Sequence, residues 1–234
     1  MRIGILKTDS VLPELSPQFG DYPDMFSALL RTADPTLEFR VWDMVAHERP
    51  ENLDICDGWL ITGSRHSVYE DLPWIRALEE LVREIHTSRR KLLAICFGHQ
   101  LVAQVLGGQT GPAPHGWTVG LQTMHRAEKL PEKRVFPQSL RLIHSHQDQV
   151  LELPEKAELL AGNEACPFGL FQIGRHILAM QGHPEFRPPY ADALYAKRRA
   201  LLGETTYAAA TESLQRSDDA STIARLMVDF VKNP

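Results

Sequence analysis

The sequence KLLAICFGHQ, residues 91–100, decides the fold. Residues 91–96 are apolar after the opening lysine, which predicts a buried strand, and residues 98–106 predict a helix that ends at a pair of glycines. Small residues lie on either side of Cys96, as a nucleophile elbow requires, because its tight turn strains the backbone of the nucleophile. The helix N-terminus also favours a thiolate. Cys96 is therefore a candidate nucleophile, with a buried structural cysteine as the alternative.

Strands and helices alternate outward from this stretch through the first half of the chain. Besides the two elements above, we predict strands over residues 3–6, 37–42 and 58–62, and helices over residues 24–30, with Asp24 as a cap, and 72–88. Residues 8–23 are rich in Pro, Ser, Asp and Gly, which predicts a loop. Such alternation is typical of right-handed βαβ crossovers around a parallel sheet.

The second half of the chain has a different pattern. Strands are predicted over residues 119–124, 140–145, 168–173 and 176–179, with a hairpin turn at Gly174-Arg175, and helices over residues 188–202 and 219–232, the second starting at Ser217 or Asp218. With few helices between them, these strands predict antiparallel additions to one edge of the sheet. The fold class is therefore α/β, with a mostly parallel sheet, antiparallel edge strands and helices on both faces, in a single domain over residues 1–234.

Composition excludes several classes of function. The chain has 234 residues and a net charge of -5, which argues against a generic nucleic-acid-binding surface. No apolar run approaches the roughly 18 residues that a membrane span needs, and the N-terminus has no signal peptide, so we expect a cytoplasmic protein. The three cysteines fit no zinc motif, and no Gly-rich loop opens a helix. We therefore expect no metal and no nucleotide cofactor.

A second motif is AMQGHPEF, residues 179–186, in which an apolar strand ends and presents His183 and Glu185. In extended backbone, residues two apart point the same way, so Glu185 is placed to orient the imidazole of His183. A surface histidine in a turn is the alternative for this motif taken alone.

The two motifs together resemble the class I glutamine amidotransferases. Two further segments, residues 62–74 and 145–154, resemble the oxyanion strand and the substrate loop of that family, and all four occur in the family's order. The wider pattern is similar to stand-alone members close to the amidotransferase domain of GMP synthetase. The resemblance implies a three-layer, flavodoxin-like sheet. Position 94 is Ala, where the family usually has Gly.

The resemblance also implies roles for particular residues. Cys96 would attack a γ-glutamyl amide to form a thioester, and His183, oriented by Glu185, would move the protons. The backbone N–H groups of Gly63 and Phe97 would form the oxyanion hole. The substrate would be held by three further residues: Gln100, Ser145 and His146, the last two in a loop after their strand.

The substrate class stays open at this point. Glutamine hydrolysis would release ammonia, either alone or for a separate synthase subunit as partner. A γ-glutamyl peptidase acting on glutathione-type compounds is the alternative, and residues 8–23, which follow the first strand, would then border the site. A catalytically silent regulatory domain and a cysteine peptidase or stress protein on a similar sheet are further alternatives, from other classes.

Overall fold

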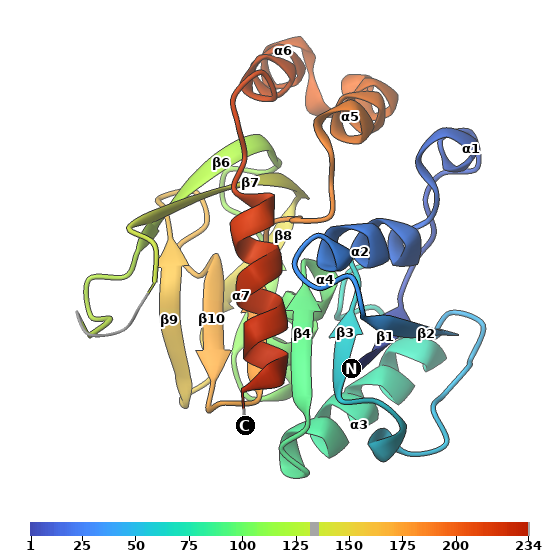
Figure 1. The fold of residues 1–234 in the computed structure, drawn as a ribbon. Coiled ribbons are helices and arrows are strands. Elements are labelled where there is room, and N and C mark those ends of the chain that lie inside the picture. The colour runs from blue at the N-terminus through green and yellow to red at the C-terminus, as the bar shows by residue number, and fades with distance from the viewer. Residues whose placement is uncertain (132–135, 234) are drawn as a thin grey trace.

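A sheet of nine strands forms the centre of the computed structural model, which describes residues 1–131 and 136–233 (Figure 1). The strand order is β2-β1-β3-β4-β11-β10-β9-β6-β7. Five neighbouring strands run parallel: β2 (Glu38–Asp43), β1 (Arg2–Lys7), β3 (Gly58–Ile61), β4 (Lys91–Ile95) and β11 (Ile177–Met180). The predicted strands of the first half are therefore confirmed.

The other part of the sheet is antiparallel. It consists of β10 (Leu170–Ile173), β9 (Ala157–Gly162), β6 (Thr118–Arg126) and β7 (Ser139–His146). The predicted hairpin turn between β10 and β11 is present, with Gly174 at a φ of +54°. β11 was expected among the antiparallel additions. It pairs antiparallel with β10 but parallel with β4, placing Met180 opposite Ile95, and so joins the two parts.

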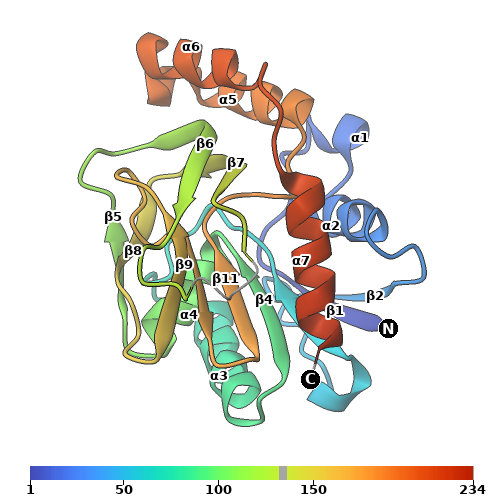
Figure 2. The same ribbon diagram turned by 60° about the vertical axis from the view of Figure 1, so that its left-hand side comes forward.

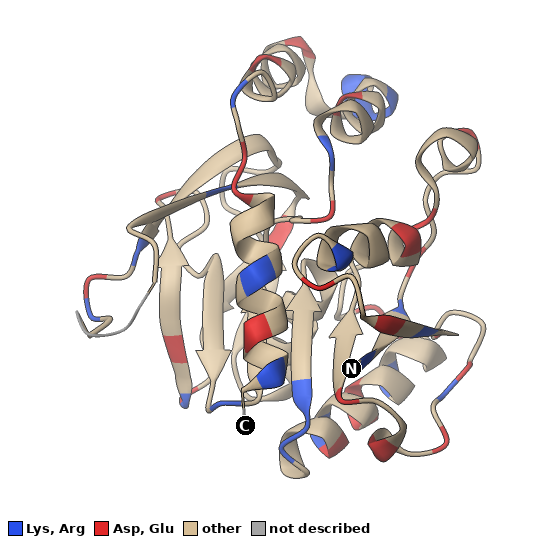
Figure 3. Cartoon of the chain, viewed as in Figure 1, with Lys and Arg blue, Asp and Glu red and all other residues tan. Residues whose placement is uncertain are grey.

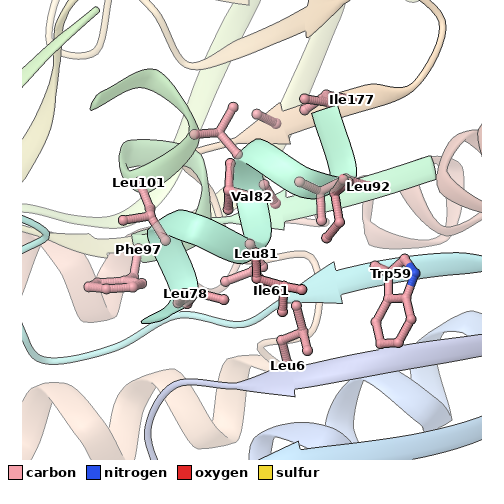
Figure 4. Close-up of a cluster of buried hydrophobic side chains, with 14 of the residues drawn as sticks. Leu6, Trp59, Ile61, Leu78, Leu81, Val82, Leu92, Phe97, Leu101 and Ile177 are labelled. Carbon is pink, nitrogen blue, oxygen red and sulfur yellow. The ribbon is translucent and has the colours of Figure 1, made fainter. Parts of the chain in front are cut away.

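Helices cover both faces of the sheet, giving three layers (Figures 1 and 2). One face carries α3 (Pro73–Thr87) and α4 (Phe97–Val105), and the other carries α2 (Tyr22–Arg31) and α7 (Ala220–Lys232). Alternate strand residues supply the two cores: Trp59 and Ile61 pack toward α3 (Figure 4), whereas Leu60 packs toward α7. A short 3-10 helix, η1 (Leu53–Ile55), precedes β3.

A third apolar cluster lies beyond the carboxyl ends of the parallel strands. There α5 (Pro188–Leu202) and α6 (Glu204–Ser213) lie side by side above the sheet (Figures 1 and 2). Tyr190 and Leu194 of α5 join Val11 and Leu15 of the N-terminal loop in this cluster. The cluster therefore ties α5 to the loop at the sheet edge where Cys96 emerges.

Several local predictions were wrong. The segment 8–23 contains a one-turn helix, α1 (Ser16–Phe19), and α2 is capped by Asp21, with Asp24 completing the capping box. Asp219 occupies the N-cap position of α7 but makes no side-chain cap hydrogen bond, while Oδ1 of Asp218 accepts from the Ala220 N–H at 3.0 Å. Three features were not predicted from the sequence: α6, β9 and a separate two-stranded sheet of β5 (Gln109–Pro112) and β8 (Asp148–Glu152). Within the described residues, no helix is both long and apolar enough to cross a bilayer.

Candidate active site

Cys96 occupies the turn between β4 and α4 with a φ of +49° and a ψ of -97°. A backbone with this φ is strained for any residue other than glycine, and such strain is typical of a nucleophile elbow. The Cys96 N–H donates to the carbonyl of Met180 at 2.9 Å, which anchors the turn to β11. The residue is 5% exposed, at the N-terminus of α4. The sequence prediction of a tight strand-to-helix turn at Cys96 is confirmed.

The turn is tight because α4 packs directly on β3. A side-chain carbon at Gly98 would lie 2.8 Å from Cβ of Ile61 and 3.0 Å from its carbonyl oxygen, so only glycine fits. Ala94 is fully buried within β4, between Ile61 and Ala179 on the neighbouring strands. The methyl group at position 94, where glycine is usual, is thus accommodated in the sheet.

His183 follows β11 and lies beside the elbow. Its Nδ1 lies 2.7 Å from Oε1 of Glu185, and both residues are almost fully buried. The His183 N–H donates to the carbonyl of Ile143 at 2.8 Å, and the imidazole stacks on the ring of Phe186 with centroids 3.9 Å apart. Backbone and ring contacts therefore hold the imidazole in one orientation, with its Nε2 edge free of the carboxylate.

The electrostatics of this pair favour an imidazolium. Burial lowers the pKa of His183, but the Glu185 carboxylate and the Cys96 sulfur outweigh it and raise that pKa to about 10. A positive imidazole beside a sulfur favours the thiolate form of the cysteine. Burial is the main influence on the other two cysteines, raising the pKa of Cys56 to about 11 and that of Cys166 to about 12.

Gly63 lies against both of these side chains. A carbon added at its Cα would lie 2.9 Å from Cε1 of His183 and 3.5 Å from Cβ of Cys96. The N–H groups of Gly63 and Phe97 donate to no acceptor in the described part of the chain. The hydroxyl of Thr8 donates to the Gly63 carbonyl at 2.9 Å, and this hydrogen bond orients the backbone at Gly63.

Comparison with known proteins identifies the family of this chain. The family model Glutamine amidotransferase class-I fits residues 25–201. The chain belongs to the class I glutamine amidotransferase family. Gamma-glutamyl peptidase 3 of Arabidopsis thaliana is 42% identical over 141 residues, which are 58% of this chain and 57% of that protein. Gamma-glutamyl peptidase 4 of the same plant is 35% identical over 175 residues, 72% and 69% of the two chains.

The fold is also that of solved amidotransferases. The crystal structure of a glutamine amidotransferase from Thermotoga maritima superposes with a TM-score of 0.74, covering 99% of this chain and 96% of that one at 19% identity. The match spans little more than half of the length of the first peptidase above. The comparisons therefore establish the family and the fold of this chain.

Two hollows meet at the amidotransferase elbow. The loop-side hollow, of about 210 Å³, is lined by the N-terminal loop and α5, including Asp9, Leu12, His183 and Lys197. The strand-side hollow, of about 300 Å³, is lined by α4 and the end of β7. Its lining includes Gln100, His146 and Asp148. Both hollows share five residues: Ser64, Arg65, Cys96, Ser145 and Arg198.

The predicted substrate contacts of this amidotransferase all line the strand-side hollow, with one correction. Ser145 and His146 lie inside β7 rather than in a loop after it. The His146 imidazole is turned inward, with Nδ1 2.9 Å from the carbonyl of Asp148 and Nε2 3.1 Å from Nδ1 of His144. Gln100 donates to the carbonyl of Asp148 at 2.7 Å. Only part of each side chain therefore remains for a ligand.

Sequence reasoning missed two polar residues at this site. Gln181 is fully buried and its amide lies 3.5 Å from Sγ of Cys96, while its oxygen accepts from Gln100 at 3.1 Å. Its position directly after β11 and two residues before His183 could have indicated that it belongs to the site. Arg198 donates to Oγ of Ser145 at 2.7 Å, stacks over Trp117, and pairs with no acid among the described residues. Nothing in the sequence distinguishes it from other charges on α5.

Proposed function

We propose that this chain hydrolyses γ-glutamyl amides by nucleophilic catalysis at Cys96. One observation carries the proposal: a strained, buried cysteine at a helix N-terminus faces a buried histidine that is 2.7 Å from a carboxylate. A nucleophile, a base and an orienting acid in that order form the working arrangement of covalent hydrolases. Among the described residues, no group of three or more metal-ligating side chains offers another centre.

The chemistry follows from the placement of these groups. The thiolate of Cys96 attacks the amide carbon, and the oxyanion that forms is stabilised by the N–H groups of Gly63 and Phe97. The imidazolium of His183 gives its proton to the departing nitrogen, the C–N bond breaks, and a γ-glutamyl thioester remains on the sulfur. His183, now neutral, takes a proton from water, which attacks the thioester and releases glutamate.

The strand-side hollow suits the γ-glutamyl group. Arg198 lies at Ser145 and has no acidic partner among residues 1–131 and 136–233, so its positive charge is available to an α-carboxylate. Gln100 and Asp148, which also line this hollow, offer polar groups to an α-amino group. These contacts place the amide carbon of the substrate near Cys96, which lines both hollows.

Trapping of the acyl-enzyme tests this proposal. Purified protein is treated with a diazoketone analogue of glutamine and digested, and the adduct is located by mass spectrometry. We expect it on Cys96, with adduct and hydrolysis both lost in Cys96→Ser and both retained in Cys166→Ser. Labelling that is equal in the two variants would refute the role of Cys96, and a protein that takes up no label and hydrolyses no γ-glutamyl compound would be the silent domain.

A peptidase activity is favoured over pure glutamine hydrolysis by the loop-side hollow. Ammonia needs no binding site, but Asp9, Ser10, Leu12, Tyr22 and α5 line a hollow that also contains Cys96 and His183. The most similar relatives reported above are named γ-glutamyl peptidases. Assays of the purified chain with glutamine and with γ-glutamyl dipeptides separate the two: higher kcat/KM for the dipeptides supports the peptidase. Strong glutamine hydrolysis that depends on an added synthase subunit would support the ammonia donor instead.

A further inference from the structure

We propose that the loop-side hollow is the leaving-group subsite and that Lys197 binds the free carboxylate of the amino acid or short peptide released from the γ-glutamyl group. This inference rests on the proposed hydrolysis at Cys96. It adds the chemical class of the amine and a residue that recognises it, on a part of the chain outside the four motifs of the family.

The positions of the catalytic groups assign the two hollows. His183 lines the loop-side hollow and not the strand-side one, whereas Gln100 and His146 line only the strand-side one. The departing nitrogen must receive its proton from His183, so the amine half of the substrate extends past this residue. Because Cys96 lines both hollows, a γ-glutamyl group in one directs the amine into the other.

Three cations line the loop-side hollow: Arg65, Lys197 and Arg198. Arg198 also lines the strand-side hollow, where the proposed function assigns it to the γ-glutamyl carboxylate. Asp9 neutralises Arg65 through two hydrogen bonds of 2.8 Å, so Arg65 lines the hollow without offering a free positive charge. Lys197 lies 3.2 Å from Glu14 of the N-terminal loop, with both side chains about half exposed. An exposed pair of this kind is weak, so a substrate carboxylate competes with Glu14 for the ammonium group.

The rest of the hollow suits an α-amino acid. Its apolar lining consists of Leu12, Tyr22, Phe186 and Leu194. α5 carries three consecutive bases, residues 197–199, at the top of the molecule (Figure 3), and Arg199 is paired with Glu204. An amine with an apolar side chain and a carboxylate therefore matches both parts of the lining.

Breaking the C–N bond in this geometry needs no further reactant. The sulfur of Cys96 bonds to the carbonyl carbon of the γ-amide as the nitrogen leaves with the proton of His183, so the product is a neutral amine that bears its carboxylate at Lys197. Water then hydrolyses the thioester. Glu14 is free to pair with Lys197 again once the product has left.

A pair of matched substrates tests the subsite in the full chain: γ-glutamyl-leucine and its C-terminal carboxamide, with kcat/KM measured for each. We expect the free acid to be preferred by about three- to fivefold, as for one exposed ion pair. Lys197→Met should bring the ratio of acid to amide to about one, and Lys197→Arg should keep it. Glu14→Gln should raise the ratio, because it removes the competing carboxylate. Lys156→Met, in the turn between β8 and β9, is the matched control and should keep the wild-type ratio.

The outcomes separate this inference from the proposed function. Hydrolysis of both peptides with an acid-to-amide ratio near one in the wild type, or a ratio that Lys197→Met leaves unchanged, would overturn the subsite and keep the activity of Cys96. If Cys96 forms no acyl-enzyme with either peptide or with glutamine, the proposed function fails and the subsite fails with it. Because the ratio compares two substrates on one protein, partial misfolding of a variant does not mimic the effect.

Discussion

A side-chain carbon at Gly63 would lie 2.9 Å from Cε1 of His183, closer than such atoms approach in proteins. The loop after β3, at Gly63, and the loop after β11, at His183, therefore pack so closely beside Cys96 that no side chain fits between them. This contact explains why the position beside the candidate base has no side chain, and it makes Gly63 a sensitive test of the site.

Gly63→Ala should abolish turnover while the protein stays folded. The methyl group would displace either the imidazole or the peptide whose N–H is the proposed oxyanion donor, and loss of one such donor costs on the order of 10²–10³ in kcat. Steady-state kinetics and circular dichroism measure the two effects. Gly111→Ala is the control, because its methyl would meet only the end of the Leu151 side chain. Full activity in Gly63→Ala would contradict the proposed geometry.

Glu185→Gln should lower kcat by about 10²–10⁴ and move the alkaline limb of the pH profile to lower pH. The carboxylate raises the pKa of His183 to about 10 against the effect of burial, so its removal lowers that pKa. The imidazolium that protonates the leaving amine then disappears at lower pH. The pH dependence of kcat/KM shows the shift. An unchanged alkaline limb would mean that this limb does not report His183.

Thr8→Val should reduce kcat about tenfold with little change in KM. The fully buried hydroxyl lies 2.9 Å from the Gly63 carbonyl and 2.9 Å from the hydroxyl of Thr62, and losing it costs about 1–2 kcal/mol in the placement of the oxyanion peptide. Thr8→Ser restores the hydroxyl and should restore kcat. Thr32→Val, on an exposed helix end, is the control. If kcat stays low in Thr8→Ser, the packing of the methyl group and not the hydroxyl is what the site needs.

Much of the fold was accessible from the sequence because the decisive elements are apolar and regular. The strand 91–96 and the helix after it appear where expected, since a fully apolar run and a glycine stop are strong local signals. α6 was missed because its sequence, ETTYAAATES, has no apolar stripe, and Ala210 is its one buried residue in the described structure. The strand β5 contains Gly and Pro, which predict a turn, and it forms only through pairing with β8.

The residues of the candidate site also fall into a group that the sequence predicts and a group that it does not. Cys96, His183 and Glu185 lie in short contiguous motifs, so their spacing carries the signal. Lys197 and Arg198 reach the site because the third apolar cluster holds α5 over the sheet edge. On the sequence they look like an ordinary solvated helix face. Tertiary packing, rather than a motif, places them there.

Acid should destabilise the protein below about pH 6.5. Burial lowers the pKa of His99 to about 4 and that of His146 to about 3, so both stay neutral in the fold while the unfolded chain takes up protons. The stability that these two neutral histidines contribute is thus complete above pH 6.5 and is lost as the pH falls toward 4. At pH 5 each such group costs on the order of 2 kcal/mol. Urea unfolding from pH 8 to 5 measures the slope.

His99→Gln provides the matched variant for this pH dependence. Its amide can still donate to the carbonyl of Phe168, which the imidazole contacts at 2.8 Å, but it cannot be protonated. The variant should therefore lose less stability between pH 8 and 5 than the wild type, even if it starts lower. An equal loss in the two proteins would exclude His99 as a source of the acid sensitivity.

The parallel pairing that puts Met180 opposite Ile95 has a consequence for the evolution of this enzyme class. The sheet itself sets the spacing between the proposed nucleophile, Cys96, and the proposed base, His183, because each residue follows the carboxyl end of one of two hydrogen-bonded neighbouring strands. The long stretch of chain between them loops out and returns without affecting that spacing. Insertions and deletions in the hairpins of the antiparallel strands are thus free to accumulate, so relatives of very different length can keep the same catalytic pair.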